Sequence, residues 1–304
     1  MVPRTDEPIE IALRDQHAAF TVTGATLCAY GVGDRPILDG FAADQVCPGA
    51  SGQLLAPWPN RIADGTYAFA GSRHPLPIDE PEFGNAIHGL VRWEKWRVDR
   101  LSADRVRFGY RLCARPGYPF PLDLSVEYRL ARSGLVVTFR ATNLGETECP
   151  FGYGAHPYYL LRDRSVENVE LCVPAREWLE IDERSIPIGH QPVAGTPLDY
   201  REPHRIGASR LDHEFTGLDR DREDVARITL RDEVDEIRLW QDRMLDFVHV
   251  YTGDTLPEPE RRRRAVAVEP MTCAANAFNS GDGLRVLHPK VPFECRWGIE
   301  VLAA

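Results

Sequence analysis

The sequence predicts an all-β fold, a large antiparallel sandwich, and three observations support it. Apolar residues alternate with polar ones along several segments, Gly and Pro interrupt the chain at short intervals, and helical spacing is scarce. A half-buried strand shows apolar residues at every second position, whereas a helix repeats them at three and four. With 24 Gly and 24 Pro in 304 residues, turns are frequent enough to divide the chain into many short strands.

Individual elements follow from where the alternation and the turn residues fall. The clearest alternating runs lie at residues 105–112, 122–130, 137–141 and 169–173. Turn residues stand at 63–65, 70–72 and 133–134. The best helical window is a short turn near residues 209–215, inside a charged stretch from 201 to 224 that we expect to be a long loop. Because neither a low-complexity linker nor a fixed repeat divides the chain, we expect one domain over residues 1–304.

Charge excludes some classes of partner. The chain has 36 Lys+Arg and 46 Asp+Glu, a net charge of −10, which disfavours nucleic acid. The basic run at 261–264 follows an acidic, Pro-rich stretch, so we expect a solvated loop whose charges cancel locally. No apolar stretch is long enough to span a membrane, and residues 1–15 are too polar for a secretory signal. We therefore expect a cytoplasmic protein without a membrane partner, acting as a monomer or homodimer.

Common catalytic motifs are missing. The sequence has no GxGxxG, GxxxxGK[ST], HExxH or GxSxG pattern, and its seven cysteines form no CxxC pair. Nucleotide binding, zinc hydrolysis and serine-hydrolase chemistry therefore lack their usual support, and we expect neither a cofactor nor a metal site.

Five segments combine polar residues with Gly, Pro and aromatic residues. They are PWPNRI at 57–62, NAIHGL at 85–90, FGYGAHPYY at 151–159, LDHEF at 211–215 and VAVEPMT at 266–272. Each is a weak motif alone, but the ordered set resembles the aldose 1-epimerase (galactose mutarotase) family over most of the chain. The resemblance implies a β-supersandwich that interconverts the α and β anomers of an aldose.

The resemblance also implies roles for particular residues. Glu269 matches the general base and His156 the general acid. His88, which we group with the catalytic residues, matches a residue that holds sugar hydroxyls, as do Arg61 and Asp212. The neighbouring substrate-binding candidates are Asn60, Trp58 and Tyr158. The two aromatic rings can stack on a sugar or pack in the core. Departures from the family pattern, such as Leu160 in place of an Asn, leave the acid–base pair intact and the preferred sugar open.

The chemistry asks for the same residue types. Opening a cyclic hemiacetal removes a proton from the C1 hydroxyl and adds one to the ring oxygen, so a carboxylate and an imidazole on opposite sides of the bond suffice. Activity should fall on the acid side as Glu269 gains a proton and on the alkaline side as His156 loses one, and burial beside apolar residues would raise the pKa of Glu269. No metal or nucleotide is needed.

Other interpretations remain open at this point. Glu269 can be a strand-edge charge, Arg61 a salt-bridge partner of Asp64, and Asp212 a helix cap. His249 we read, with the other histidines outside the motifs, as a packed or surface residue, and His213 stays undecided. The alternatives at the level of function are a hexose-6-phosphate 1-epimerase, a glycosidase that uses Glu269 and Asp212, and a noncatalytic sugar-binding protein.

Overall fold

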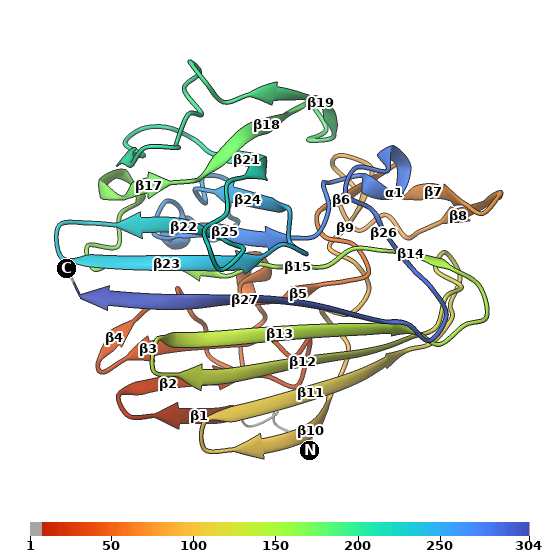
Figure 1. Cartoon of the computed structure of the whole chain (residues 1–304), viewed down its shortest axis with the longest axis horizontal. Coiled ribbons are helices and arrows are strands. Elements are labelled where there is room, and N and C mark those ends of the chain that lie inside the picture. The colour runs from red at the N-terminus through yellow and green to blue at the C-terminus, as the bar shows by residue number, and fades with distance from the viewer. Residues whose placement is uncertain (1–7, 304) are drawn as a thin grey trace.

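The computed structural model describes residues 8–303 and shows a molecule built almost wholly of antiparallel strands (Figure 1). Within these residues, helical structure is limited to α1 (Ala277–Ser280) and three short 3-10 turns (Pro48–Ala50, Val166–Asn168 and Pro259–Arg261). The predicted all-β sandwich is therefore confirmed. No helix in the described part of the chain is long and apolar enough to cross a membrane. Residues 1–7, part of the polar N-terminal segment, lie outside the described residues.

The larger sheet has nine strands within the described residues and runs the length of the molecule (Figure 1). Its order is β10 (Arg97–Ser102), β11 (Arg105–Leu112), β12 (Leu122–Ala131), β13 (Gly134–Asn143), β27 (Pro292–Ala303), β23 (Asp235–Asp242), β22 (Val225–Arg231), β17 (Glu170–Cys172) and β20 (His204–Arg205). The last strand along the chain, β27, lies in the middle and joins β13 to β23.

A second sheet carries most of the side chains discussed below. Its order is β19 (Pro187–Pro192), β18 (Ala175–Ile181), β21 (Asp212–Leu218), β24 (Phe247–Tyr251), β25 (Val266–Met271), β15 (Gly154–Ala155) and β5 (Leu54–Leu55), and β16 (Tyr158–Tyr159) also pairs with β25. All six residues of β25 are buried, so other parts of the chain cover both faces of this strand.

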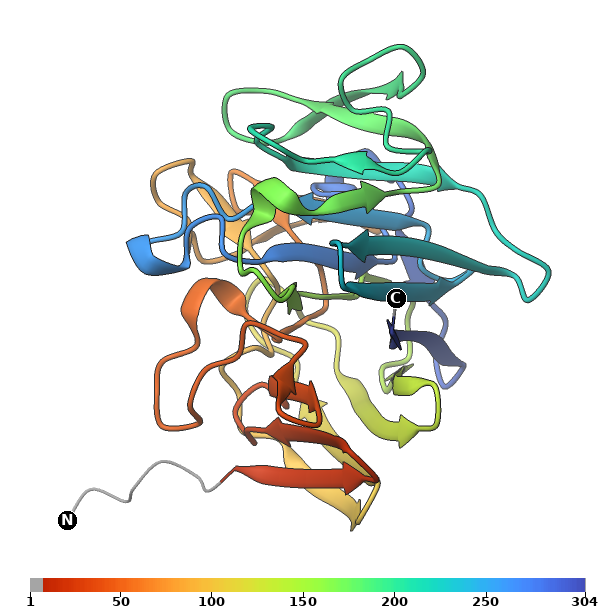
Figure 2. The same ribbon diagram turned by 90° about the vertical axis from the view of Figure 1, so that its left-hand side faces the viewer.

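Smaller sheets complete the molecule. One has four strands in the order β1 (Ile9–Leu13), β2 (Gln16–Phe20), β3 (Leu27–Val32) and β4 (Arg35–Pro36). The others are two-stranded and pair β6 (Arg61–Ala63) with β9 (Asn85–Ile87), β7 (Thr66–Phe69) with β8 (Ser72–Pro75), and β14 (Cys149–Phe151) with β26 (Arg285–Leu287). Figure 2 shows β1–β3 at one end of the molecule and the β18–β19 hairpin at the other.

The alternating runs form strands as predicted. Residues 105–112 and 122–130 lie in β11 and β12, which pair in register so that Phe108 faces Val126. Both side chains are fully buried in the core, and the intervening arginines are more exposed. The runs at 137–141 and 169–173 contribute to β13 and β17. Burial of one face of each strand supplies the main stabilisation of the sheet.

The expectation for residues 201–224 is wrong in part. The segment 209–215 does not form a helical turn, because β21 begins at Asp212 and pairs with β18 on one side and β24 on the other. The long loop is also interrupted by β20. The apolar alternation that would have revealed β21 is absent because Asp212 and Glu214 occupy alternate positions on one of its faces.

The basic run at 261–264 is not neutralised by the acidic residues just before it. Arg261 and Arg264 both form ion pairs with Asp39, which is buried, and Arg263 forms one with Asp254. Two guanidinium groups compensate the buried Asp39 carboxylate, so this run joins distant parts of the chain. The prediction of a solvated loop with local cancellation is corrected accordingly.

Candidate active site

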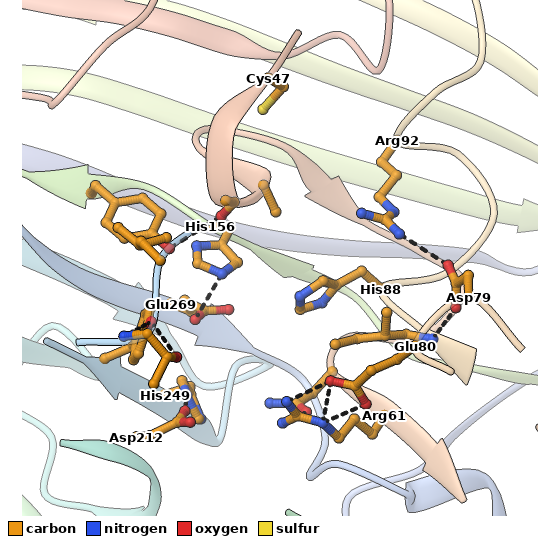
Figure 3. A pocket seen from close by; sticks show the side chains of 18 of the residues that line it. Cys47, Arg61, Asp79, Glu80, His88, Arg92, His156, Asp212, His249 and Glu269 are labelled. Atoms are coloured by element: carbon orange, nitrogen blue, oxygen red, sulfur yellow. Dashed lines mark hydrogen bonds and ion pairs between the residues drawn. The ribbon is translucent and has the colours of Figure 1, made fainter. Parts of the chain in front are cut away.

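A cavity of about 420 Å³ brings the five motif segments together. They contribute Asn60, Arg61, Ile87, His88, His156, Tyr158, Asp212 and Glu269 to its wall. In Figure 3, Glu269, His156 and Asp212 lie on one side of the cavity, and Arg61 and His88 on the other. A cleft of this size, with several converging polar groups, suits a small molecule.

A tight turn after β9 positions His88. Its backbone has a φ of 63°, and its N–H donates a hydrogen bond to the carbonyl oxygen of Asn60 at 2.9 Å. Gly89 follows with a φ of 74°, and a Cβ there would lie 2.1 Å from the carbonyl oxygen of Ala56. Only glycine fits so close to the neighbouring backbone, which explains the His-Gly pair of the second motif.

His156 is held by the backbone between β15 and β16. Its N–H donates to the carbonyl oxygen of Gln53 at 3.1 Å, and its own carbonyl accepts from the Gly52 N–H at 2.8 Å. The ring of Tyr158 stacks on the imidazole with centroids 5.0 Å apart. Just before it, Gly154 allows β15 to approach the first motif, because a Cβ there would lie 2.8 Å from the Cβ of Pro59.

Glu269 and His156 are in direct contact. Nε2 of His156 lies 3.3 Å from Oε1 of Glu269, and both residues are buried (Figure 3). The other polar atoms, Nδ1 of His156 and Oε2 of Glu269, have no hydrogen-bond partner among residues 8–303. We expected the two groups on opposite sides of the hemiacetal bond, and the structure places them side by side. Adjacent groups suit the reaction, because the C1 hydroxyl and the ring oxygen are both bonded to C1.

Burial reverses the ordinary order of their pKa values. Removal from water raises the pKa of Glu269 to about 8, with the charges of Asp212 and Glu214 adding to the effect and that of His249 opposing it. Burial also lowers the pKa of His156 to about 3. Both shifts have burial as their largest cause and favour the neutral forms, a protonated Glu269 beside an unprotonated His156.

Arg61 pairs with Glu80 rather than with Asp64. Its Nε and Nη2 donate to the Glu80 carboxylate at 2.8–3.1 Å, and its Nη1 donates to Oδ1 of Asn60 at 3.3 Å. Asp64 is bonded instead by Arg184, at 2.9 Å. A second arginine of the cavity wall, Arg92, pairs with Asp79 at 2.9 Å. Both cavity arginines are thus neutralised by carboxylates.

Asp212 starts a strand and does not cap a helix. Its carboxylate Oδ1 lies 2.8 Å from Nε2 of His249, a residue of β24 that also lines the cavity. The sequence analysis missed His249, because nothing in its spacing distinguishes it from other histidines. The undecided His213 lies outside the cavity wall and packs edge-on against Trp178.

The two aromatic candidates differ in position. Tyr158 lines the cavity, and its hydroxyl donates to the carbonyl oxygen of Gly49 at 3.1 Å. Trp58 is buried outside the cavity wall, where its ring packs against Phe278 at 5.9 Å. The expectation that Trp58 stacks on a sugar is corrected, because the hydrophobic core occupies its ring. Trp93, which is half exposed, is a second aromatic residue on the wall.

Comparison with known proteins identifies the family. The aldose 1-epimerase family model matches residues 10–294. Uncharacterized protein YihR of Escherichia coli K12 is 32% identical over 94% of this chain and 90% of its own length. Human galactose mutarotase is 32% identical over 64% of this chain and 60% of its own. Among solved structures, an aldose epimerase homologue from C. elegans matches with a TM-score of 0.87 at 20% identity, covering 98% of this chain and 99% of that one. With the ordered motifs gathered around one cavity, these matches show that the chain belongs to the aldose 1-epimerase family.

Proposed function

We propose that the protein interconverts the α and β anomers of a free aldose, such as galactose or glucose, by acid–base opening and closure of the ring. The observation that carries the proposal is the buried contact between Glu269 and His156 inside the cavity. Proton transfers alone complete this reaction, so the proposal includes no cofactor and no metal ion. We also propose that the enzyme is cytoplasmic and acts as a monomer or a homodimer.

The proton shared by the pair explains how one site can be both acid and base. In the productive form the proton has moved from Glu269 to His156 across their 3.3 Å contact. The Glu269 carboxylate then takes the proton of the C1 hydroxyl while His156 gives its proton to the ring oxygen, and the bond between C1 and the ring oxygen breaks. Rotation about the C1–C2 bond presents the other carbonyl face, and the same transfers in reverse close the ring.

The remaining wall residues would hold the sugar. The guanidinium of Arg61, the carboxylate of Asp212 and the ring of His88 offer hydrogen-bonding groups to hydroxyls, and Asn60 lies beside Arg61. The ring of Tyr158 offers an apolar face next to the catalytic pair. Hydroxyl contacts persist from the bound sugar to the transition state, so these residues serve binding more than rate.

The charges of the cavity favour a free sugar over a hexose 6-phosphate. A phosphate needs unpaired cationic donors, whereas Arg61 and Arg92 already pair with Glu80 and Asp79. The basic run at 261–264 is engaged with Asp39 and Asp254 and is not part of the cavity wall.

Polarimetry provides the direct test. Fresh α-glucose, α-galactose and α-glucose 6-phosphate are followed with and without the protein, in buffer containing excess chelator. We expect equilibration of a free aldose to outpace the buffer control and the Glu269→Gln variant. Equilibration at the buffer rate for every free aldose contradicts the proposal, and acceleration of the phosphate ester alone favours the hexose-6-phosphate epimerase. Sugar binding without acceleration favours a noncatalytic binding protein, and release of sugar from a glycoside favours a glycosidase.

A further inference from the structure

Three ionisable residues stand in a row across neighbouring strands of the cavity. Glu214 of β21 is the direct cross-strand partner of His249 of β24, and His249 is the direct partner of Glu269 of β25. Directly opposed residues project from the same face of a sheet. Asp212, two residues before Glu214, shares that face as well. His249 therefore has carboxyl groups on both sides, one of which is the proposed base.

His249 is buried among charges. Its Nε2 lies 2.8 Å from Oδ1 of Asp212, and its Nδ1 lies 4.0 Å from Oε1 of Glu214 without a hydrogen-bond partner. Both His249 and Glu214 are less than a tenth exposed. The titratable groups that act on His249 or feel its charge are Asp212, Glu214, His213, Glu269, His156 and His88.

We infer that His249 is a positioning residue of this site: its protonated ring anchors the Asp212 carboxylate and supplies the positive charge against which Glu269 ionises. The inference rests on the proposed function and adds a residue that the motifs do not contain. A buried carboxylate is costly without a compensating charge. His249 is the cation in direct contact with the cluster of Asp212, Glu214 and Glu269, and Arg61 acts on the same three groups from the other side of the cavity.

The electrostatics of the site agree with the geometry. Burial by itself would lower the pKa of His249, but the hydrogen bond to Asp212 and the charges of Glu269, Asp212 and Glu214 raise it to about 9. His249 thus stays protonated at neutral pH. Its charge in turn lowers the pKa of both Glu269 and His156, opposing the larger effect of burial on Glu269 and adding to it on His156.

A titration followed by NMR tests the charge without relying on activity. The ring nitrogens of His249, assigned by comparison with the His249→Gln variant, should report a protonated ring up to about pH 9. A ring that titrates at or below the ordinary value of 6.5 overturns the inference. Because this readout needs no substrate, it separates failure of the inference from failure of the proposed function, which polarimetry of the wild-type protein decides.

The pH profile of the His249→Gln variant tests the effect on the catalytic pair. Glutamine keeps an amide donor for Asp212 but removes the positive charge, so both limbs of the kcat/KM profile should move to higher pH. His288→Gln is the control: this exposed histidine pairs with Glu148 outside the cavity wall, and the profile of the variant should match the wild type. Limbs that stay in place or move to lower pH in His249→Gln overturn the inference, because a purely structural role would not move them upward.

A second variant leaves His249 itself in place. In Glu214→Gln, the loss of a neighbouring carboxylate should lower the pH at which His249 titrates, since the charge of Glu214 is one of those that raise its pKa. Circular dichroism and thermal unfolding establish that each variant is folded. An unchanged titration of His249 in folded Glu214→Gln counts against the inference even if His249→Gln does not fold.

Discussion

At the residue scale, the proposed mechanism predicts different kinetic effects for the acid–base pair, Glu269 and His156, and for the residues proposed to bind the sugar. In the proposed mechanism, replacing either residue of the pair removes a group that acts in the transition state, whereas replacing Arg61 removes a proposed hydroxyl contact. We expect Glu269→Gln and His156→Asn each to lower kcat by roughly 10²–10⁴-fold with little change in KM. Arg61→Ala should instead mainly raise KM.

The measurement is steady-state polarimetry on folded protein, with His288→Gln as a control that replaces an exposed histidine paired with Glu148. Glu269→Gln and His156→Asn nearly preserve the size of each side chain, so we expect both variants to fold and any loss of activity to reflect the lost acid or base. A Glu269→Gln protein with near-normal kcat would refute the assignment of the base.

The same two residues fix the pH dependence. Burial lowers the pKa of His156 to about 3 and raises that of Glu269 to about 8. We therefore expect kcat/KM to stay high from mildly acid pH to near pH 8 and then to fall. With ordinary pKa values of 4.5 for the glutamate and 6.5 for the histidine, kcat/KM would instead have a narrow maximum between pH 4.5 and pH 6.5. Glu269 would then set the acid limb and His156 the alkaline limb.

Initial rates of anomer interconversion, corrected for the buffer reaction, decide between these two profiles. A fall in kcat/KM between pH 6 and pH 7 contradicts the raised pKa of Glu269.

At the element scale, apolar faces were predictable from the sequence and polar faces were not. The strands at 105–112 and 122–130 show their alternation because one face is buried in the core. The strand at 212–218 does not, because Asp212 and Glu214 occupy positions that a core strand gives to apolar residues. A strand that contributes to the site thus loses the signal by which strands are recognised.

Some residues of the candidate site could likewise be predicted from the sequence and others could not. The ordered motifs led us to propose His88, His156 and Glu269 as site residues, and all three line the same cavity. The motifs did not reveal His249, whose position beside Glu269 follows from the pairing register of two strands rather than from any local pattern. Register depends on the whole sheet and cannot be read from a short segment.

The turn that holds His88 yields a prediction for a single element. Gly89→Ala places a Cβ against the carbonyl of Ala56 and forces a positive φ on alanine, so we expect a loss of roughly 2–4 kcal/mol in the free energy of unfolding. The displaced turn should also raise KM, since His88 lies in the cavity wall.

Gly195→Ala is the matched control, because Gly195 also has a positive φ, of 76°, but no atom within 4 Å of the added Cβ. It should lose only about 1–2 kcal/mol and keep the wild-type KM. Urea unfolding and polarimetry measure both quantities, and equal losses in the two variants would contradict the close-contact explanation.

At the scale of the whole molecule, we propose that residues 1–304 form one domain, as expected from the sequence. One buried hydrophobic cluster extends from Ile11 to Ile299 across the described residues and includes side chains from both large sheets. A continuous core of this kind should unfold as a unit.

We expect circular dichroism and tryptophan fluorescence to report a single, coincident transition in urea. The six tryptophans are spread from Trp58 to Trp297, so fluorescence samples most of the chain. Two separate transitions, or different midpoints for the two probes, would show that the chain contains independent domains.

The central place of β27 has a consequence for biosynthesis. During translation β27 is made after the other eight strands of the nine-stranded sheet. It is nevertheless the strand that pairs with both β13 and β23. A chain that folds before β27 emerges would hold two half-sheets, each with an open edge whose backbone groups can pair with another polypeptide. Pairing of β27 with β13 and β23 closes both edges, so we expect the largest sheet to be completed late in folding and to benefit from chaperones that cover exposed strands.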